Sequence, residues 1–92
     1  MANVAGVFNA NGNSTTIIVS HAKLSVTLWG VYNAMTILQA SYNKGSTWVD
    51  VQQVLVGRTI IEEAERGVYY RLNCSMFVSG PANYRLGTSE VQ

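Results

Sequence analysis

The 92-residue chain predicts an all-β fold, a small antiparallel β-sandwich or barrel of about seven short strands with an extended N-terminal arm. Three observations predict it. Apolar and polar residues alternate along several short segments, glycine and asparagine recur between those segments, and no long segment follows the helical period. Because a sheet this small leaves one face in water, two half-apolar faces are expected to pack together.

The first fifteen residues are small, polar and rich in asparagine, with Val4, Val7 and Phe8 as isolated apolar side chains. A segment of this kind orders poorly on its own but can lie across a neighbour. We therefore expect an extended arm over residues 1–15, one sandwich domain over 16–88 and a mobile tail over 89–92. Val4, Val7 and Phe8 are the candidates for contacting a partner.

The first half of the domain shows two strand patterns before a hairpin. Residues 16–20 contain a β-branched run, which favours a strand. Residues 23–30 alternate, with Leu24, Val26 and Leu28 on one side. Residues 35–42 and 47–52 then form the two arms of a predicted hairpin, closed by residues that tolerate positive φ.

The second half is predicted to hold three more strands. The β-branched residues of 54–61 favour a strand, followed by a charged turn over 62–67, although the same glutamates could form two helical turns ending at Gly67. Residues 67–75 alternate again, and Ser79-Gly80-Pro81-Ala82 ends that strand. Residues 83–87 form the last one.

The composition limits the kinds of partner that the chain is expected to bind. Charged residues make up 12% of the chain, about half the usual share, and the net charge is +1 with the arginines scattered. We therefore expect no nucleic-acid partner, and no stretch reaches the ~18 apolar residues of a membrane span. The N-terminus has no secretory-signal pattern, which predicts a protein made in the cytoplasm. A surface this poor in charge is expected to be covered by partners.

No pattern of reactive side chains predicts an enzyme or a cofactor. The single histidine, His21, has no nucleophile motif near it, and Glu62, Glu63 and Glu65 cluster in one predicted turn. Asp50 is expected to be exposed or bonded across the hairpin. The single cysteine, Cys74, follows the apolar side of its strand together with Met76, so we expect a buried thiol. No spacing predicts a metal site.

The hairpin carries a recognisable motif. Ser41, Asn43, Gly45, Thr47 and Trp48 have the spacing Ser-x-Asn-x-Gly-x-Thr-Trp. This resembles the Asp-box of sialidase-like propellers, with Asn43 in the place of the aspartate. The chain is too short for a propeller of several four-stranded blades. The resemblance therefore implies structural roles: turn hydrogen bonds from Ser41, Asn43, Gly45 and Thr47, and packing under the turn from Trp48.

A wider resemblance covers residues 24–75 by pattern. A strand at Leu24-Ser25-Val26, the Thr36–Asp50 hairpin and the Gly67-Val68-Tyr69-Tyr70-Arg71-Leu72 strand together resemble short bacteriophage virion proteins. This implies a non-enzymatic structural protein of the virion. Among these we expect a capsid decoration (cement) protein on the capsid surface, bound to the major capsid protein and to neighbouring copies of itself, a trimer among the possible homo-oligomers.

Two alternatives stay open. The same resemblance includes tail-, fibre- or baseplate-associated virion proteins. The aromatic residues also allow a carbohydrate-binding β-sandwich module, because aromatic faces stack on sugar rings. Packing inside the sandwich or at subunit interfaces accounts for aromatics equally well. The aromatic residues in question are Trp29, Trp48, Tyr32, Tyr42, Tyr69 and Tyr84.

Overall fold

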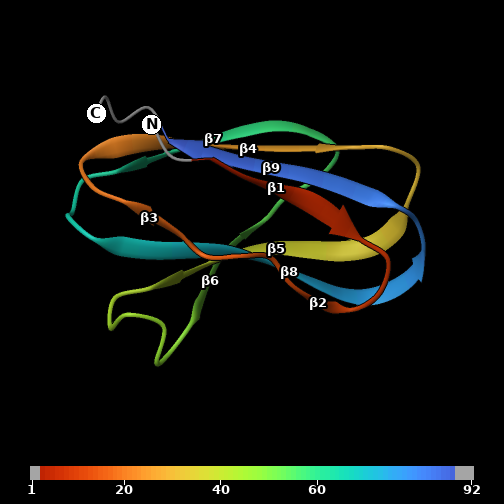
Figure 1. Cartoon of the computed structure of the whole chain (residues 1–92), viewed down its shortest axis with the longest axis horizontal. Coiled ribbons are helices and arrows are strands. Elements are labelled where there is room, and N and C mark those ends of the chain that lie inside the picture. Colours follow the sequence, from red (N-terminus) through yellow and green to blue (C-terminus); the bar gives the residue numbers. More distant parts are fainter. Residues whose placement is uncertain (1–2, 89–92) are drawn as a thin grey trace.

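The computed structural model describes residues 3–88, which form two antiparallel β-sheets packed face to face (Figure 1). One sheet has the order β1-β9-β4-β7 and the other β2-β8-β5-β6, with β3 also paired to β8. The predicted all-β sandwich is confirmed, and the described residues form nine strands, more than expected. The strands are β1 (Asn3–Phe8), β2 (Gly12–Asn13), β3 (Ile17–Val19), β4 (Ala22–Trp29), β5 (Asn33–Ser41), β6 (Val49–Gln53), β7 (Gly57–Glu63), β8 (Val68–Ser79) and β9 (Ala82–Thr88).

The core lies between the two sheets. Figure 1 shows the two sheets edge-on, one above the other. The predicted alternation of β4 is confirmed, because Leu24, Val26 and Leu28 are at most 1% exposed. Facing them from the second sheet are Leu38 and Ala40 of β5 and Val68, Tyr70, Leu72 and Cys74 of β8.

The N-terminal segment is a strand of the sandwich, which corrects the expected division at residue 15. Strand β1 pairs with β9 over its whole length, from Asn3 opposite Gly87 to Phe8 opposite Ala82. Phe8 is buried, and its ring stacks on Tyr84 with centroids 4.7 Å apart. Gly6 makes room for this tyrosine, because a Cβ there would lie 2.6 Å from the Tyr84 hydroxyl.

The residues that follow β1 are also tied to the body. The Ser14 amide donates to the Leu72 carbonyl, and the Leu72 amide donates to the Ser14 hydroxyl, both at 2.8 Å. These two bonds join the β2 and β3 pairings into one edge along β8. The small, polar composition of this segment therefore reflects edge pairing and close packing. The predicted mobile tail, 89–92, lies outside the described residues.

Strand β7 is longer than the sequence predicts. It runs from Gly57 to Glu63 and pairs with β4 up to Glu63 opposite Ala22. Glu62 and Glu63 therefore lie in the strand, which corrects the expected charged turn over 62–67. Because successive side chains of a strand alternate between its faces, Glu62 is exposed while Glu63 is buried.

Three connections meet at one end of the sandwich. These are residues 9–11, 30–32 and 80–81, which lie together on the right of Figure 1. A Cβ at Gly30 would lie 3.0 Å from the carbonyl oxygen of Pro81, so two of the connections touch. The Phe77 amide donates to Asn11 Oδ1 at 2.9 Å, which ties the third to β8. We call this the turn end.

Candidate functional site

The hairpin turn is closed by its own side chains. The Ser41 hydroxyl donates to Asn43 Oδ1 at 2.8 Å and accepts the Gly45 amide at 2.8 Å. The same Asn43 oxygen accepts the Thr47 amide at 2.9 Å. Gly45 has φ of +91°, a conformation that glycine adopts without strain. Each motif residue of the turn is thus used in holding the backbone, and none is aimed at a ligand.

Trp48 lies half-buried between the turn and the outer face of its sheet. A Cβ at Gly45 would lie 3.6 Å from Trp48 Cζ2, so the indole runs beneath the turn. The Arg71 guanidinium stacks 4.1 Å from the ring centroid on the indole. Arg71 Nε also donates to Gln39, whose amide donates to Asp50 Oδ1, both at 2.9 Å. Asp50 was expected to be exposed or bonded across the hairpin, and the structure shows both.

The three expected partner-contact residues occupy different places. Phe8 is in the core, and Val4 packs against the core from β1. Val7 points outward and is 46% exposed. Of these three residues, only Val7 is therefore available to a partner in this fold. Side chains alternate between the two faces of a strand, and Val4 and Phe8 fall on the inward face.

Glu63 forms a buried cluster that the sequence did not reveal. Its carboxylate accepts the Tyr70 hydroxyl at 2.6 Å and the Glu65 amide at 2.9 Å. A buried carboxylate needs such donors, because burial without them is costly. The signal in the sequence was the alternation of Thr59, Ile61 and Glu63 along one side of β7. This cluster connects the end of β7 to β8 and therefore has a structural role.

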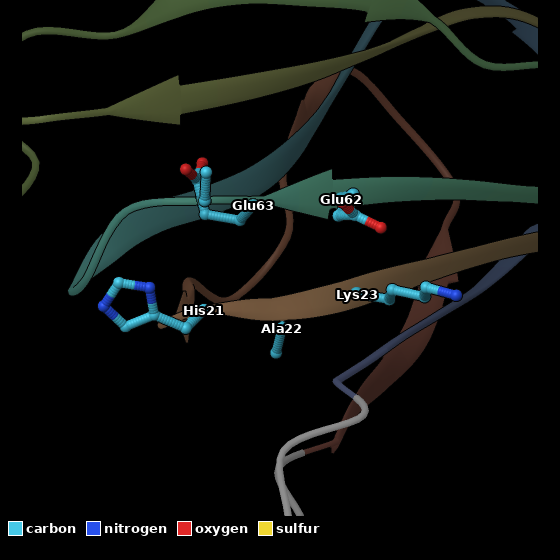
Figure 2. Close-up of a pocket in the computed structure, with 6 residues that line it drawn as sticks. His21, Ala22, Lys23, Glu62 and Glu63 are labelled. Carbon is cyan, nitrogen blue, oxygen red and sulfur yellow. The ribbon is translucent and has the colours of Figure 1, made fainter.

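A shallow hollow of about 520 Å³ lies next to this cluster, lined by His21, Ala22, Lys23, Glu62, Glu63 and Ala64. Figure 2 shows that the Glu62 and Glu63 side chains leave β7 in different directions and that His21 lies at the far end from Lys23. The Glu63 oxygens are already taken by Tyr70 and Glu65. The hollow thus offers no carboxylate–imidazole pair arranged for proton transfer.

The Tyr70 phenol predicts a loss of stability at alkaline pH. Burial, followed by the hydrogen bond to Glu63, raises the pKa of Tyr70 well above its ordinary value near 10. Above pH about 10 the unfolded chain loses this proton while the folded chain keeps it, so the free energy of unfolding should fall as the pH rises further. Chemical unfolding measured from pH 8 to about 11.5 should show that the free energy of unfolding falls less steeply with pH for Tyr70→Phe than for the wild type.

Tyr69→Phe is the matched control, because Tyr69 is the neighbouring tyrosine on the outer face of β8. The free energy of unfolding of Tyr69→Phe should fall with rising pH as steeply as that of the wild type. Equal slopes for Tyr70→Phe and the wild type would show that the Tyr70 phenol does not carry the effect.

Other reactive groups form no site among residues 3–88. Cys74 is 1% exposed, which confirms the predicted buried thiol, and burial raises its pKa. Within the described residues, no three His, Cys, Asp or Glu side chains gather as a metal site would require. The same part of the chain contains no helix of the length and apolar character needed to cross a membrane.

Exposed apolar side chains form the most distinctive surface features. Two groups account for ten of the twelve large hydrophobic residues that are exposed in the described part of the chain. One group lies on or beside the turn end, and we call it the turn-end patch: Val7, Trp29, Val31, Met76 and Val78. The other follows the β6–β7 segment: Val49, Val51, Leu55, Val56 and Ile60.

A β-bulge in β8 creates part of the turn-end patch. Asn33 pairs with Ser79 but Met35 pairs with Ser75, so β8 holds two extra residues between these pairs. Met76 has φ of +52°, which is uncommon for a residue other than glycine. The bulge turns Met76 and Val78 outward, to 69% and 72% exposed, and corrects the prediction that Met76 follows the buried side. Bulges of this kind often re-aim side chains at functional sites.

A hollow of about 260 Å³ lies against the bulge, lined by Asn33, Ala34, Met35, Gln53, Met76 and Val78. Its walls are mainly neutral and apolar. Such a depression suits an apolar side chain of a partner better than a charged ligand.

Comparison with protein-family models, with curated proteins and with solved structures found no match for this chain.

Proposed function

We propose that this chain is a non-enzymatic phage structural protein, a capsid decoration (cement) protein that binds and stabilises the shell of the major capsid protein. The virion assignment is supported by the resemblance of the Thr36–Asp50 hairpin and its flanking strands. The binding role is supported by one structural observation above the others: the bulge that presents Met76 and Val78 outward at the turn end.

The exposed apolar surface at the turn end costs free energy in water. Exposed Val31, Met76 and Val78 leave apolar area in contact with water, and burying such area yields about 25 cal/mol per Å². A bulge with a positive φ at methionine also costs conformational energy. A partner that covers the patch offsets both costs, because the apolar side chains are then removed from water. Methionine suits such a contact because its unbranched side chain adapts to irregular surfaces.

The rest of the molecule fits a binding role. The sandwich presents the turn end on a body held by two long central strands, β5 and β8, so the patch needs little ordering on binding. Charged residues make up only 12% of the chain, which limits repulsion when copies crowd together on a shell.

Met76→Lys is expected to weaken binding to shells about tenfold. The contact loses the buried apolar side chain of the methionine, and the lysine ammonium must be desolvated to enter it. The side chain is 69% exposed, so folding should be retained. Co-sedimentation of the full chain with undecorated shells measures the change. Ile18→Lys is the control, because Ile18 is 48% exposed on β3, outside the patch. Equal binding by Met76→Lys and the wild type would contradict a role for the bulge.

A carbohydrate-binding role is the second candidate, favoured by the exposure of Trp29. Its side chain is 47% exposed on the outer face of β4, in register with Asn83 of β9. An exposed indole offers a flat apolar face on which a sugar ring can stack. A glycan array with the full chain should then give hits that Trp29→Ala loses while it stays folded, and an array without hits would remove this candidate.

A further inference from the structure

Strand β7 ends one sheet and carries an unusual arrangement of charge. Among residues 3–88 it pairs only with β4, so its other edge is open to a further strand. Its outer face presents Arg58, Ile60 and Glu62 in sequence, all exposed, with Ile60 at 56%. An apolar residue thus stands between a cation and an anion at equal spacing.

This spacing is self-complementary. When two copies of one strand pair antiparallel about a twofold axis, residues at equal distances before and after the axis lie opposite each other. With the axis at Ile60, Arg58 of one copy faces Glu62 of the other, and the reverse pair forms as well. Ile60 then faces its own counterpart. The geometry points to a homodimer formed by β7–β7 pairing in this register, with a second copy of this chain as the occupant of the β7 edge.

The register follows from the charges. With the axis moved to Thr59, Arg58 faces Ile60 of the second copy and Glu62 faces the preceding loop. With the axis moved to Ile61, Glu62 faces Ile60 instead. Only the register centred on Ile60 pairs both charges, and opposite charges across a strand pair stabilise it while like charges destabilise it.

The surroundings of β7 support the same interface. Within residues 3–88, five of the twelve exposed large hydrophobic residues fall between Val49 and Ile60, a range that includes β6 and the connection to β7. Strand β6 ends the second sheet, just as β7 ends the first. Both sheets therefore finish on this side of the sandwich. Pairing through β7 brings the two copies' 49–60 segments toward each other and gives these side chains an apolar neighbour.

The open edge also needs an explanation. Unpaired strand edges invite association, and proteins usually protect them with proline, short strands or inward charges. The seven residues of β7 include no proline, and the strand is longer than the average. Its one inward charge, Glu63, is the last residue of the strand and leaves the stretch around Ile60 unprotected. Pairing with a second copy satisfies this edge and extends the sheet to β1-β9-β4-β7 continued by the same four strands in reverse.

This inference does not rest on the proposed function, because it concerns the free protein in solution. The expectation of homo-oligomers from composition named no surface, whereas the β7 edge specifies a twofold contact. Failure of dimerisation leaves shell binding through the turn-end patch intact, and failure of shell binding leaves the dimer intact.

Charge reversal tests the proposal directly by sedimentation of the full chain over a range of concentrations. The wild type should dimerise, and R58E and E62R alone should each weaken dimerisation by about tenfold or more, because each sets like charges opposite each other twice. An equal mixture of R58E and E62R should form heterodimers tighter than the homodimers of either variant, because both opposite-charge pairs across the axis are restored. Lys44→Glu, in the hairpin turn, is the control and should not change the equilibrium.

A thiol placed on the axis tests the register. Cys74 is buried, so Ile60→Cys adds one accessible thiol that faces its counterpart across the axis within the Cα separation of a disulfide. Mild oxidation should cross-link Ile60→Cys rapidly, and Val78→Cys only slowly, although Val78 is the more exposed position. A monomeric wild type, an unrescued mixture or equal cross-linking of the two variants would overturn the proposal.

Discussion

Replacing Phe8 with alanine is expected to lower the free energy of unfolding by about 3–4 kcal/mol. Phe8 is 5% exposed, and its ring stacks on Tyr84 beneath β1. The substitution removes a large aromatic side chain from a filled site and leaves a cavity, and the neighbouring strand pairing prevents the site from collapsing. Chemical denaturation of the full chain measures the change.

Val7→Ala is the control for this experiment, because Val7 lies next to Phe8 on the same strand but is 46% exposed. Its free energy of unfolding should change by less than about 1 kcal/mol. Similar, small effects of both substitutions would mean that residues 3–8 act as an arm on the surface. A large effect of Phe8→Ala alone supports β1 as a strand of the core.

Replacing Ser41 with alanine is expected to lower the free energy of unfolding by about 2 kcal/mol. Ser41 is fully buried, and its hydroxyl both donates to Asn43 and accepts the Gly45 amide. Without it, the Gly45 amide loses its acceptor and the Asn43 oxygen loses one of its donors. The variant should also expose the turn to faster amide hydrogen exchange at Gly45 and Thr47.

Asn43→Asp is expected to raise the free energy of unfolding instead of lowering it. The oxygen that accepts the Ser41 hydroxyl and the Thr47 amide becomes charged, and charge-assisted hydrogen bonds are stronger than neutral ones. We expect a gain of up to about 1 kcal/mol at pH 7, lost as the carboxyl is protonated in acid. Ser46→Ala is the control, because Ser46 is exposed in the same turn. A destabilising Asn43→Asp would show that the turn does not favour the charged form.

The sequence predicts the interior of the fold well where burial alone decides the pattern. The alternation of residues 23–30 matches β4, and Cys74 lies in the core as expected. These strands sit at the centre of their sheets, so one face is buried whatever the neighbouring strands do. The pattern of the N-terminal segment does not predict a core strand, because few of its residues reach the core. Gly6 contributes by being small, which becomes visible only when Tyr84 lies over it.

The candidate surfaces could not be predicted in the same way. Met76 continues the apolar alternation of β8, and only the pairing of β5 with β8 introduces the bulge that turns it outward. Glu63 was expected in a turn because three glutamates follow closely in sequence. Its burial depends on the Tyr70 hydroxyl, which comes from another strand. Both features arise from contacts between segments that are distant in the sequence, so the local composition does not predict them.

The location of the chain in intact particles tests the central claim most directly. The proposed function predicts a phage particle that carries this chain, so separated heads and tails allow the chain to be quantified in each against the major capsid protein. A decoration protein should be present in heads, at a copy number proportional to the shell protein, and should leave the shell less resistant to heat when removed. A chain found only in tails, or absent from particles, would contradict the account.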